Sequence, residues 1–309
     1  MTRTPQIVFL ADGRRLHLQD GPIDLIVEAR GSDANVRAAY GAAVRRFTGL
    51  LDELCSELPL LRTAADPARC LLQGVVARRM HVAVAPFASD HFITPMAAVA
   101  GAVAEEILGA MLRAAQLHHA YVNNGGDLAL HLGDGEHFTI GLADRPDAHG
   151  VMRTIMVDAD DPTRGVATSG RHGRSFSLGI ADAVTVRAPT ASQADAASTI
   201  IANAVDLPGH PAIVRCPAHD LQPDSDLGAR LVTRDVDVLS DGDIEDALVA
   251  GTTCARKLLA AGLIDGAALR LQGEMLLVAP RSFGMTTPRA LLHGGLLGSI
   301  ETRQRGAAR

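Results

Sequence analysis

Residues 122–128 read Val-Asn-Asn-Gly-Gly-Asp-Leu, a stretch in which apolar flanks enclose an amide pair, two glycines and an acid. The pattern predicts a strand that breaks into a polar turn, because glycine adopts positive φ and lets a ligand approach the bare backbone. Asn and Asp beside such a turn can bind oxygen-rich groups or cap the turn itself. A hairpin turn that binds nothing is the alternative interpretation, so other segments must decide between the two.

The segments around this turn predict an α+β fold of hairpins with helices between them, because short apolar runs alternate with Gly-containing turns and capped helical patterns. The expected strands cover residues 7–10, 16–18, 23–27, 128–132, 138–142, 153–157, 176–186, 212–214, 268–271 and 275–278. The expected helices run over 33–51, 66–84 and 241–261, and from 94 and 191 onward.

We therefore expect mixed or antiparallel sheets with packed helices in one unit over residues 1–280, followed by a Gly/Arg-rich, partly mobile tail over 281–309. A parallel Rossmann sheet is not expected, because no GxGxxG follows a strand.

The composition of the 309 residues is that of a soluble globular protein, with 47% hydrophobic and 21% charged residues. Tryptophan is absent, aromatic residues make up 3%, and the net charge is −6. These values argue against nucleic-acid binding, which needs stacking platforms and a basic face. Four cysteines without a CxxC motif indicate buried thiols in a reducing compartment. With no signal peptide or membrane span evident, we expect a cytoplasmic protein.

A second suggestive segment is residues 165–175, which is rich in hydroxyl groups, glycines and positive charge. Thr168 and Ser169 offer hydroxyls, Gly170 offers an exposed amide, and Arg174 with Ser175 follows closely. Groups of these three kinds are the ones that bind a phosphate in proteins. The same composition is also typical of a solvated loop.

A third segment is the helix expected from Ala191, which carries Asp195 and Thr199. The i,i+4 spacing places both side chains on one helix face. A carboxylate above a hydroxyl can hold Mg²⁺, with water and phosphate oxygens completing the shell. The alternative is that Asp195 only stabilises the helix N-terminus. The small residues of 96–104 would let a flat ligand or another backbone come close.

Taken in order, residues 95–101, 122–127, 167–170, 183–186 and 194–199 resemble the ApbE-like superfamily. The resemblance covers about residues 94–200 and is greatest to the uncharacterised bacterial and archaeal branch of that superfamily. Its best-known members are FAD:protein FMN transferases, which use Mg²⁺ to cleave FAD and attach FMN to a threonine of a target flavoprotein. The resemblance thus implies Mg²⁺ and FAD or FMN as cofactors.

The matching positions imply roles for individual residues. Asp195 and Thr199 match the Mg²⁺ ligands of the superfamily, and Ala100 matches the residue whose carbonyl completes that site. The flavin-pocket turn Asn-x-Gly-Gly-Asp is matched by Asn123, Gly125, Gly126 and Asp127, and Asn124 at its variable position is a further candidate ligand-binding residue. The Ala-Thr-Ser-Gly loop is matched by Thr168, Ser169 and Gly170.

Two departures separate this chain from the transferases. They usually carry a lysine where this chain has Gly101, and an Asp-Pro-x-Thr-Gly turn after the Ala-Thr-Ser-Gly loop. Here Asp161-Pro162-Thr163 precedes that loop, and we expect an ordinary turn there.

The functional expectation is a Mg²⁺-assisted enzyme that acts on a small molecule with a phosphate and a flat ring, by FMN transfer or FAD pyrophosphate cleavage. The alternatives are an enzyme with another pterin-like or nucleotide substrate, and a non-catalytic ligand-binding or assembly protein on the same scaffold. The apolar helix 96–104 and the closing strands also suggest a homodimer.

Overall fold

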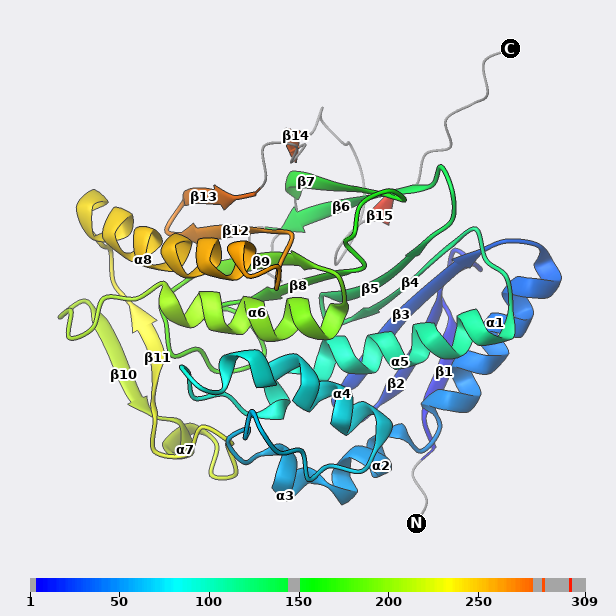
Figure 1. Cartoon of the computed structure of the whole chain (residues 1–309), viewed down its shortest axis with the longest axis horizontal. Coiled ribbons are helices and arrows are strands. Elements are labelled where there is room, and N and C mark those ends of the chain that lie inside the picture. Colours follow the sequence, from blue (N-terminus) through cyan, green and yellow to red (C-terminus); the bar gives the residue numbers. More distant parts are fainter. Residues whose placement is uncertain (1–3, 144–150, 280–284, 287–299, 302–309) are drawn as a thin grey trace.

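The computed structural model describes residues 4–143, 151–279, 285–286 and 300–301. Its centre is a nine-stranded sheet in the order β1-β2-β3-β4-β5-β8-β9-β12-β13 (Figure 1), in which every pair is antiparallel. Its strands are β1 (Gln6–Phe9), β2 (Leu16–Asp20), β3 (Ile23–Arg30), β4 (His119–Asn124), β5 (Asp127–Leu132), β8 (Gly165–Ser169), β9 (Ala183–Ala188), β12 (Gly266–Leu271) and β13 (Glu274–Val278). The prediction of antiparallel sheets with packed helices is confirmed.

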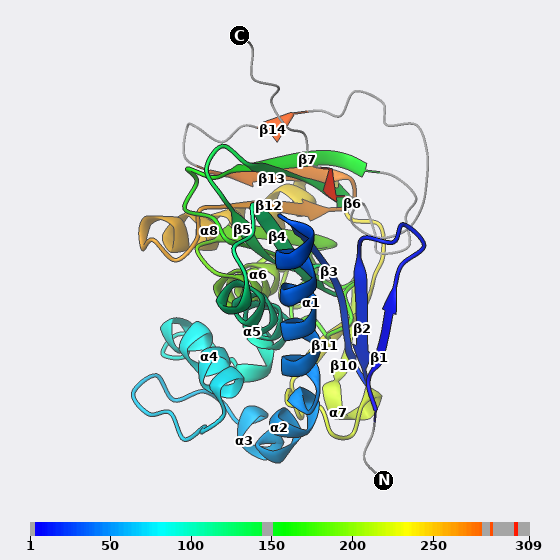
Figure 2. The same ribbon diagram turned by 90° about the vertical axis from the view of Figure 1, so that its right-hand side faces the viewer.

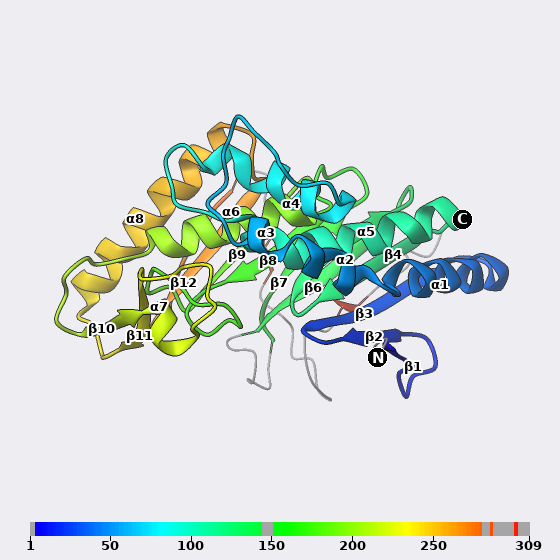
Figure 3. The ribbon, with the colours of Figure 1, turned by 90° about the horizontal axis from the view of Figure 1, so that it is seen from below.

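Long helices cover one face of this sheet (Figures 2 and 3). They are α1 (Asp33–Phe47), α5 (Val99–Ala114), α6 (Ala191–Ala204) and α8 (Asp241–Ala260). Leu16, Leu18, Leu25 and Val27 point toward them, because alternate residues of a strand share a face, and all four are fully or almost fully buried. Shorter helices lie outside this layer: α2 (Leu50–Ser56), α3 (Leu58–Leu61), α4 (Val75–Val84), η1 (Ala85–Phe87) and η2 (Pro95–Ala98).

A second, smaller core lies on the other face of the sheet. There β6 (His137–Ala143) and β7 (Val151–Asp158) form a hairpin that is extended by β14 (Met285–Thr286) and β15 (Ile300–Glu301). Phe138 and Ile155 of this hairpin pack with Tyr121 and Leu130 of the large sheet. A separate pair, β10 (Ile213–Pro217) and β11 (Leu231–Val236), flanks the short helix α7 (Ala218–Leu221).

Three predicted elements end or begin elsewhere. The first helix stops at Phe47 and a new one starts at Leu50, because Gly49 adopts φ +82° between them. The helix predicted from Asp66 begins only at Val75, after an irregular segment that contains Pro67. The strand predicted over 176–186 begins at Ala183, because the apolar Ile180 is buried in a loop and not in the sheet.

The cysteine prediction is wrong in part, since Cys55 and Cys70 are exposed and only Cys216 and Cys254 are half-buried. Cys55 lies on the outer side of the short helix α2, which explains its exposure.

Residues 95–114 form a helical stretch that is long and apolar enough to cross a membrane by length and composition. In the structure this stretch packs against the sheet and against the helices α1, α4 and α6, with Val103, Ile107 and Met111 fully buried. Packing in the core therefore accounts for its composition. Apart from β14 and β15, the expected tail over 281–309 lies outside the described residues, so its mobility stays a prediction.

Candidate functional site

The predicted Gly-Gly turn joins β4 to β5 in a tight hairpin. Asn124 pairs with Asp127 across it, and Gly125 and Gly126 adopt φ +64° and +118°. The side-chain oxygen of Asn123 accepts a hydrogen bond from the amide of Gly126 at 2.8 Å. Asn123 therefore stabilises the turn itself, while the two exposed glycines leave the backbone open.

The hairpin contacts the first turn of α5, which in turn contacts α6. The Asn124 side chain donates to the carbonyl of Ala100 at 3.1 Å. The next residue, Gly101, donates its amide to the carboxylate of Asp195 at 3.0 Å. Ala100 and Asp195, which are far apart in sequence, are thus brought to the same place beside the turn.

Two glycines allow this close approach. A Cβ at Gly101 would lie 2.3 Å from the carbonyl oxygen of Ala191, and one at Gly165 would lie 2.2 Å from the carbonyl of Thr190. Any side chain at either position would therefore collide with the backbone that opens α6. The first turn of α6 packs directly on α5 and on β8 for this reason.

The predicted Thr-Ser-Gly loop begins at the end of β8, next to the hairpin. The amide of Thr168 donates to the carboxylate of Asp127 at 3.1 Å, and its hydroxyl shares a hydrogen bond of 2.8 Å with that of Thr185 on β9. Thr168 is exposed and Ser169 half-buried. Gly170 adopts φ +155°, and a Cβ there would lie 2.5 Å from the carbonyl of Asp182, so only glycine fits.

Arg174 returns from this loop to the hairpin. Its guanidinium lies against Gly125, within 3.1 Å of the point where a Cβ would stand, and the side chain is exposed. Ser175 is exposed as well, and no hydrogen bond joins it to the other predicted residues in the part of the chain that the structure describes. The loop therefore contributes a hydroxyl and a guanidinium to the site, and Ser175 lies at its margin.

Asp127 and Asp195 are held in a state that disfavours their negative charge. Burial raises the pKa of Asp127 to about 7, against the hydrogen bond from Thr168 and the charge of Arg174. Burial and then the charge of Asp127 raise the pKa of Asp195 well above its usual value, against the amides of Gly101 and Ala100. Two neighbouring carboxylates of this kind favour a bound cation, because its positive charge would offset both their burial and the repulsion between them.

The interpretation of Asp195 as a helix N-terminal charge is not favoured. The first turn of α6 contains no acidic residue, and the effect of the helix dipole on a charge falls off beyond that turn. The N-terminus is satisfied instead by Thr190, which accepts from Gln193, and by Glu105, which accepts from the amide and hydroxyl of Ser192 at 2.6 and 2.7 Å. Asp195 is therefore available for another partner.

Thr199 is half-buried one turn further along α6, on the same face as Asp195. Among the described residues, no hydrogen bond joins it to the rest of the site, and no group of three or more His, Cys, Asp or Glu side chains is assembled. A cation here would therefore use the carboxylates together with oxygens from Thr199, the Ala100 carbonyl, water and a bound ligand.

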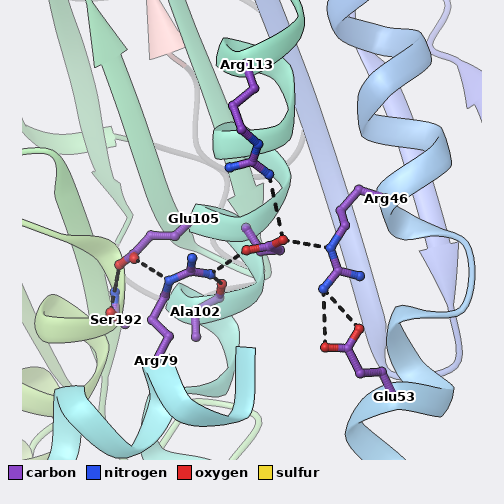
Figure 4. Close-up of polar contacts among 8 residues, drawn as sticks. Arg46, Glu53, Arg79, Ala102, Glu105, Arg113 and Ser192 are labelled. Carbon is purple, nitrogen blue, oxygen red and sulfur yellow. Dashed lines mark hydrogen bonds and ion pairs between the residues drawn. The ribbon is translucent and has the colours of Figure 1, made fainter. Parts of the chain in front are cut away.

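An ion-pair network ties α5 to the helices around it (Figure 4). Glu105 forms an ion pair with Arg79 at 3.2 Å in addition to its hydrogen bonds from Ser192. Glu106 forms ion pairs with Arg79 at 3.0 Å and with Arg46 at 2.7 Å. The network fixes α5 against α6 and so positions Ala100 relative to Asp195. Sequence reasoning missed the role of Glu105, because only the fold brings it to the start of α6. It also missed the role of Thr185 as the hydrogen-bond partner of Thr168. The available signal was a polar residue between the apolar Val184 and Val186 of a strand, which places Thr185 on the opposite face of the sheet from them.

The comparisons with known proteins agree with a shared scaffold over most of the chain. A family described as AbpE bacteria matches residues 7–277. A UPF0280 protein of Methanopyrus kandleri is 35% identical over 182 residues, which are 58% of this chain and 69% of the relative. A UPF0280 protein of Methanococcoides burtonii is 32% identical over 182 residues, covering 56% and 69%. One from Methanosphaerula palustris is 31% identical over 186 residues, covering 52% and 73%.

Because its family match runs through β1, both cores and the hairpin β12–β13, this chain belongs to the AbpE bacteria family and is similar to archaeal UPF0280 proteins.

Proposed function

We propose that this protein is a Mg²⁺-assisted enzyme of the ApbE-like superfamily that binds a flavin nucleotide, FAD or FMN, and acts on its phosphate groups. The observation that carries the proposal is the pair of carboxylates, Asp127 and Asp195, whose pKa values are both raised beside an exposed hydroxyl and guanidinium. FMN transfer and cleavage of the FAD pyrophosphate are the two reactions that suit such a site.

The donor set suits Mg²⁺. Mg²⁺ prefers hard oxygen ligands and keeps part of its water shell, so one or two carboxylates with a carbonyl and a hydroxyl are sufficient. Asp195, Thr199 and the carbonyl of Ala100 would hold the ion, and the carboxylate of Asp127 would add a further negative charge to the site. The Ala100 carbonyl accepts from Asn124 and, within α5, belongs to the helical hydrogen-bond ladder, so the ion would take the place of the Asn124 amide.

Mg²⁺ would neutralise the charge that develops on a pyrophosphate during its cleavage. Arg174 would pair with a phosphate oxygen, because its exposed guanidinium already lies over Gly125. The hydroxyl of Thr168 would bind a second phosphate oxygen. The exposed backbone at Gly126 would then receive the ring, since a Cβ there would meet nothing within 4 Å.

The contribution of the small-residue helix to the ring pocket is narrower than expected. Ala98, Ala102 and Val103 are completely buried in the core, so they face no ligand. The half-buried residues of η2 and the start of α5 are Met96, Ala97, Val99 and Ala100. Only these four are proposed as neighbours of the ring.

A ligand-binding protein without catalysis remains the alternative, and two observations favour it. The space at Gly101 is filled by the backbone of α6, so a lysine like that of the transferases cannot stand there. The Asp161–Gly165 segment also has a structural role: Thr163 is fully buried, donates to Asp265 at 2.8 Å and accepts from Arg187. The chain thus lacks two elements that the transferases use.

The test is to purify the full chain, measure its flavin absorbance, and incubate it with excess FAD with and without Mg²⁺. The enzyme hypothesis predicts Mg²⁺-dependent release or transfer of FMN. Flavin binding without turnover would support the binding protein. If neither binding nor turnover is observed, the flavin proposal fails, and metabolite profiling of protein from its native host would then reveal another pterin-like or nucleotide ligand.

The homodimer stays a prediction. The helix 96–104 that suggested it is packed inside the chain, so this surface is not available for a partner. The closing strand β13, which also suggested it, exposes Leu276 and Leu277, at 38% and 40%. The opposite edge strand β1 exposes Ile7, Val8 and Phe9, at 41%, 51% and 58%. Light scattering at micromolar concentration tests the expectation, and a mass near that of the 32.3 kDa monomer would reject it.

A further inference from the structure

An open pocket of about 630 Å³ lies at the far end of the sheet from the Gly-Gly turn. Its walls include Gly31 and His119, and Arg30 pairs with His119 at the end of β3 and β4 that is opposite to the Leu25–Asn124 pair. The turn between β1 and β2 and the start of α1 meet at this end (Figure 2). The pocket is therefore separate from the site of Asp127 and Asp195.

Three arginines line this pocket, one from each surrounding segment. They are Arg14 in the β1–β2 turn, Arg30 at the end of β3 and Arg37 in α1. No hydrogen bond or ion pair joins the side chain of Arg14 or Arg37 to another residue within the described part of the chain, and both are exposed. Arg30 approaches Glu28 only to 3.7 Å. The N–H donors of Arg14 and Arg37 are thus available to a ligand, whereas Arg30 is paired with Glu28.

Three carboxylates also line the pocket and equal the arginines in number. Glu28 accepts a hydrogen bond from the buried Tyr121 at 3.2 Å, and Glu136 is paired with His119 at 3.0 Å. Asp33 is exposed in the first turn of α1, where it faces the positive end of the helix dipole. None of these carboxylates is paired with Arg14 or Arg37 in the described part of the chain, so the guanidinium groups of those two arginines remain open to a ligand.

One wall of the pocket is aromatic and held in place. Phe9 and Tyr40 stand edge to face with ring centroids 5.8 Å apart. The hydroxyl of Tyr40 donates to the carbonyl of Arg14 at 2.6 Å and accepts from the amide of Ala29 at 3.2 Å. These bonds fix the tyrosine ring and the backbone of Arg14 together, while the ring of Phe9 remains 58% exposed.

We infer that this pocket binds a small organic oxyanion, a phosphate monoester or a carboxylate, with a flat apolar group attached. Guanidinium groups bind both oxyanions through paired N–H donors, and the exposed ring of Phe9, held by the buried Tyr40, receives the flat group. The inference does not depend on the proposed function, because none of its residues belongs to the carboxylate site.

The experiment is calorimetric titration of the full chain, in EDTA at physiological ionic strength, with phenyl phosphate, benzoate, inorganic phosphate and phenol. We expect phenyl phosphate or benzoate to bind, inorganic phosphate to bind more weakly, and phenol not to bind. The anion that binds better identifies the source of the oxyanion. Absence of binding by all three anions would overturn the inference.

The variants locate the binding. Arg14→Gln and Arg37→Gln should each weaken it roughly tenfold or more, because each removes charged hydrogen bonds. Arg45→Gln, an exposed arginine of α1 outside the pocket, should leave it unchanged. Phe9→Ala should remove the preference for phenyl phosphate over inorganic phosphate. Wild-type affinity in both Arg14→Gln and Arg37→Gln would contradict a specific pocket. A loss of affinity in Arg45→Gln as large as in those two variants would contradict it as well.

Discussion

The carboxylate of Asp195 on α6 accepts a hydrogen bond of 3.0 Å from the backbone amide of Gly101 on α5, 94 residues earlier in the chain. The contact depends on the missing side chain at Gly101, because a Cβ would lie 2.3 Å from the carbonyl oxygen of Ala191. The packing of two helices therefore decides where this carboxylate stands in the candidate site.

The substitution Gly101→Ala is expected to destabilise the protein by at least about 1–3 kcal/mol, since backbone atoms of α6 would have to move. Gly109→Ala, in the same helix, is the matched control: its Cβ would meet only the flexible side chain of Arg113, at 3.1 Å. That variant should be neutral or stabilised by about 0.5–1 kcal/mol. Urea unfolding measures both, and equal effects would contradict the close packing of α5 on α6.

The ion pairs of Glu106 give a second prediction. This residue is 5% exposed, and burial raises the pKa of its carboxyl, but the hydrogen bonds and charges of Arg46 and Arg79 together lower that pKa below its usual value. Glu106→Gln should cost about 1.5–3 kcal/mol, because it removes charged hydrogen bonds from Arg46 and Arg79, which keep only Glu53 and Glu105 as partners. Arg113→Gln, which removes an exposed arginine 3.9 Å away, should cost less than about 0.5 kcal/mol. Thermal unfolding of both variants tests this, and a similar small loss in each would show that the network is not cooperative.

The local parts of the site were predictable from the sequence because short-range chemistry determines them. Two glycines after Asn124 specify a tight hairpin, and the i,i+4 spacing of Asp195 and Thr199 specifies a shared helix face. The close packing of α6 at Gly101 and Gly165 could not be deduced, because the sequence shows only that these residues are small and not which backbone lies against them.

The juxtaposition of Asp127 with Asp195 was not predictable from local pattern, because it depends on how β5, β8, α5 and α6 pack. The loop 176–182 was mistaken for a strand for a related reason. Its apolar Ile180 is buried in a loop and not in a sheet. The amide of Ile180 donates to the carbonyl of Val205, directly after α6. Apolar composition alone does not distinguish these two environments.

Protonation of Asp127 gives a third prediction. Folding raises its pKa from 3.8 to about 7, so the folded state binds the proton more tightly than the unfolded state does. The free energy of unfolding of the metal-free protein should therefore fall as the pH rises from about 4 to about 7. Asp127→Asn removes this titration, so urea unfolding at pH 5 and pH 8 in EDTA should show a smaller decline in the variant. Parallel declines would contradict the raised pKa.

The same protonation predicts that Mg²⁺ affinity increases with pH. A metal competes with the proton for a carboxylate, so binding should strengthen between about pH 6 and pH 8 and release protons. Calorimetry in two buffers of different ionisation enthalpy measures that release. Affinity independent of pH would show that the ion, if bound, does not use Asp127 or Asp195.

The sharpest prediction concerns Asp195 and Thr199 as ligands of Mg²⁺. Asp195→Asn should abolish Mg²⁺ binding while the fold persists, and Thr199→Val, which keeps the shape but removes the oxygen, should weaken it on the order of tenfold. Asp246→Asn and Thr253→Val, at exposed positions of α8, are the matched controls and should bind like the wild type. If Asp195 served only the helix dipole, its loss would cost about 0.3–1 kcal/mol of stability and leave binding unchanged. Titration of Mg²⁺ with and without FAD separates the cases, because identical isotherms for the wild type, Asp195→Asn and Thr199→Val exclude a metal site at these residues.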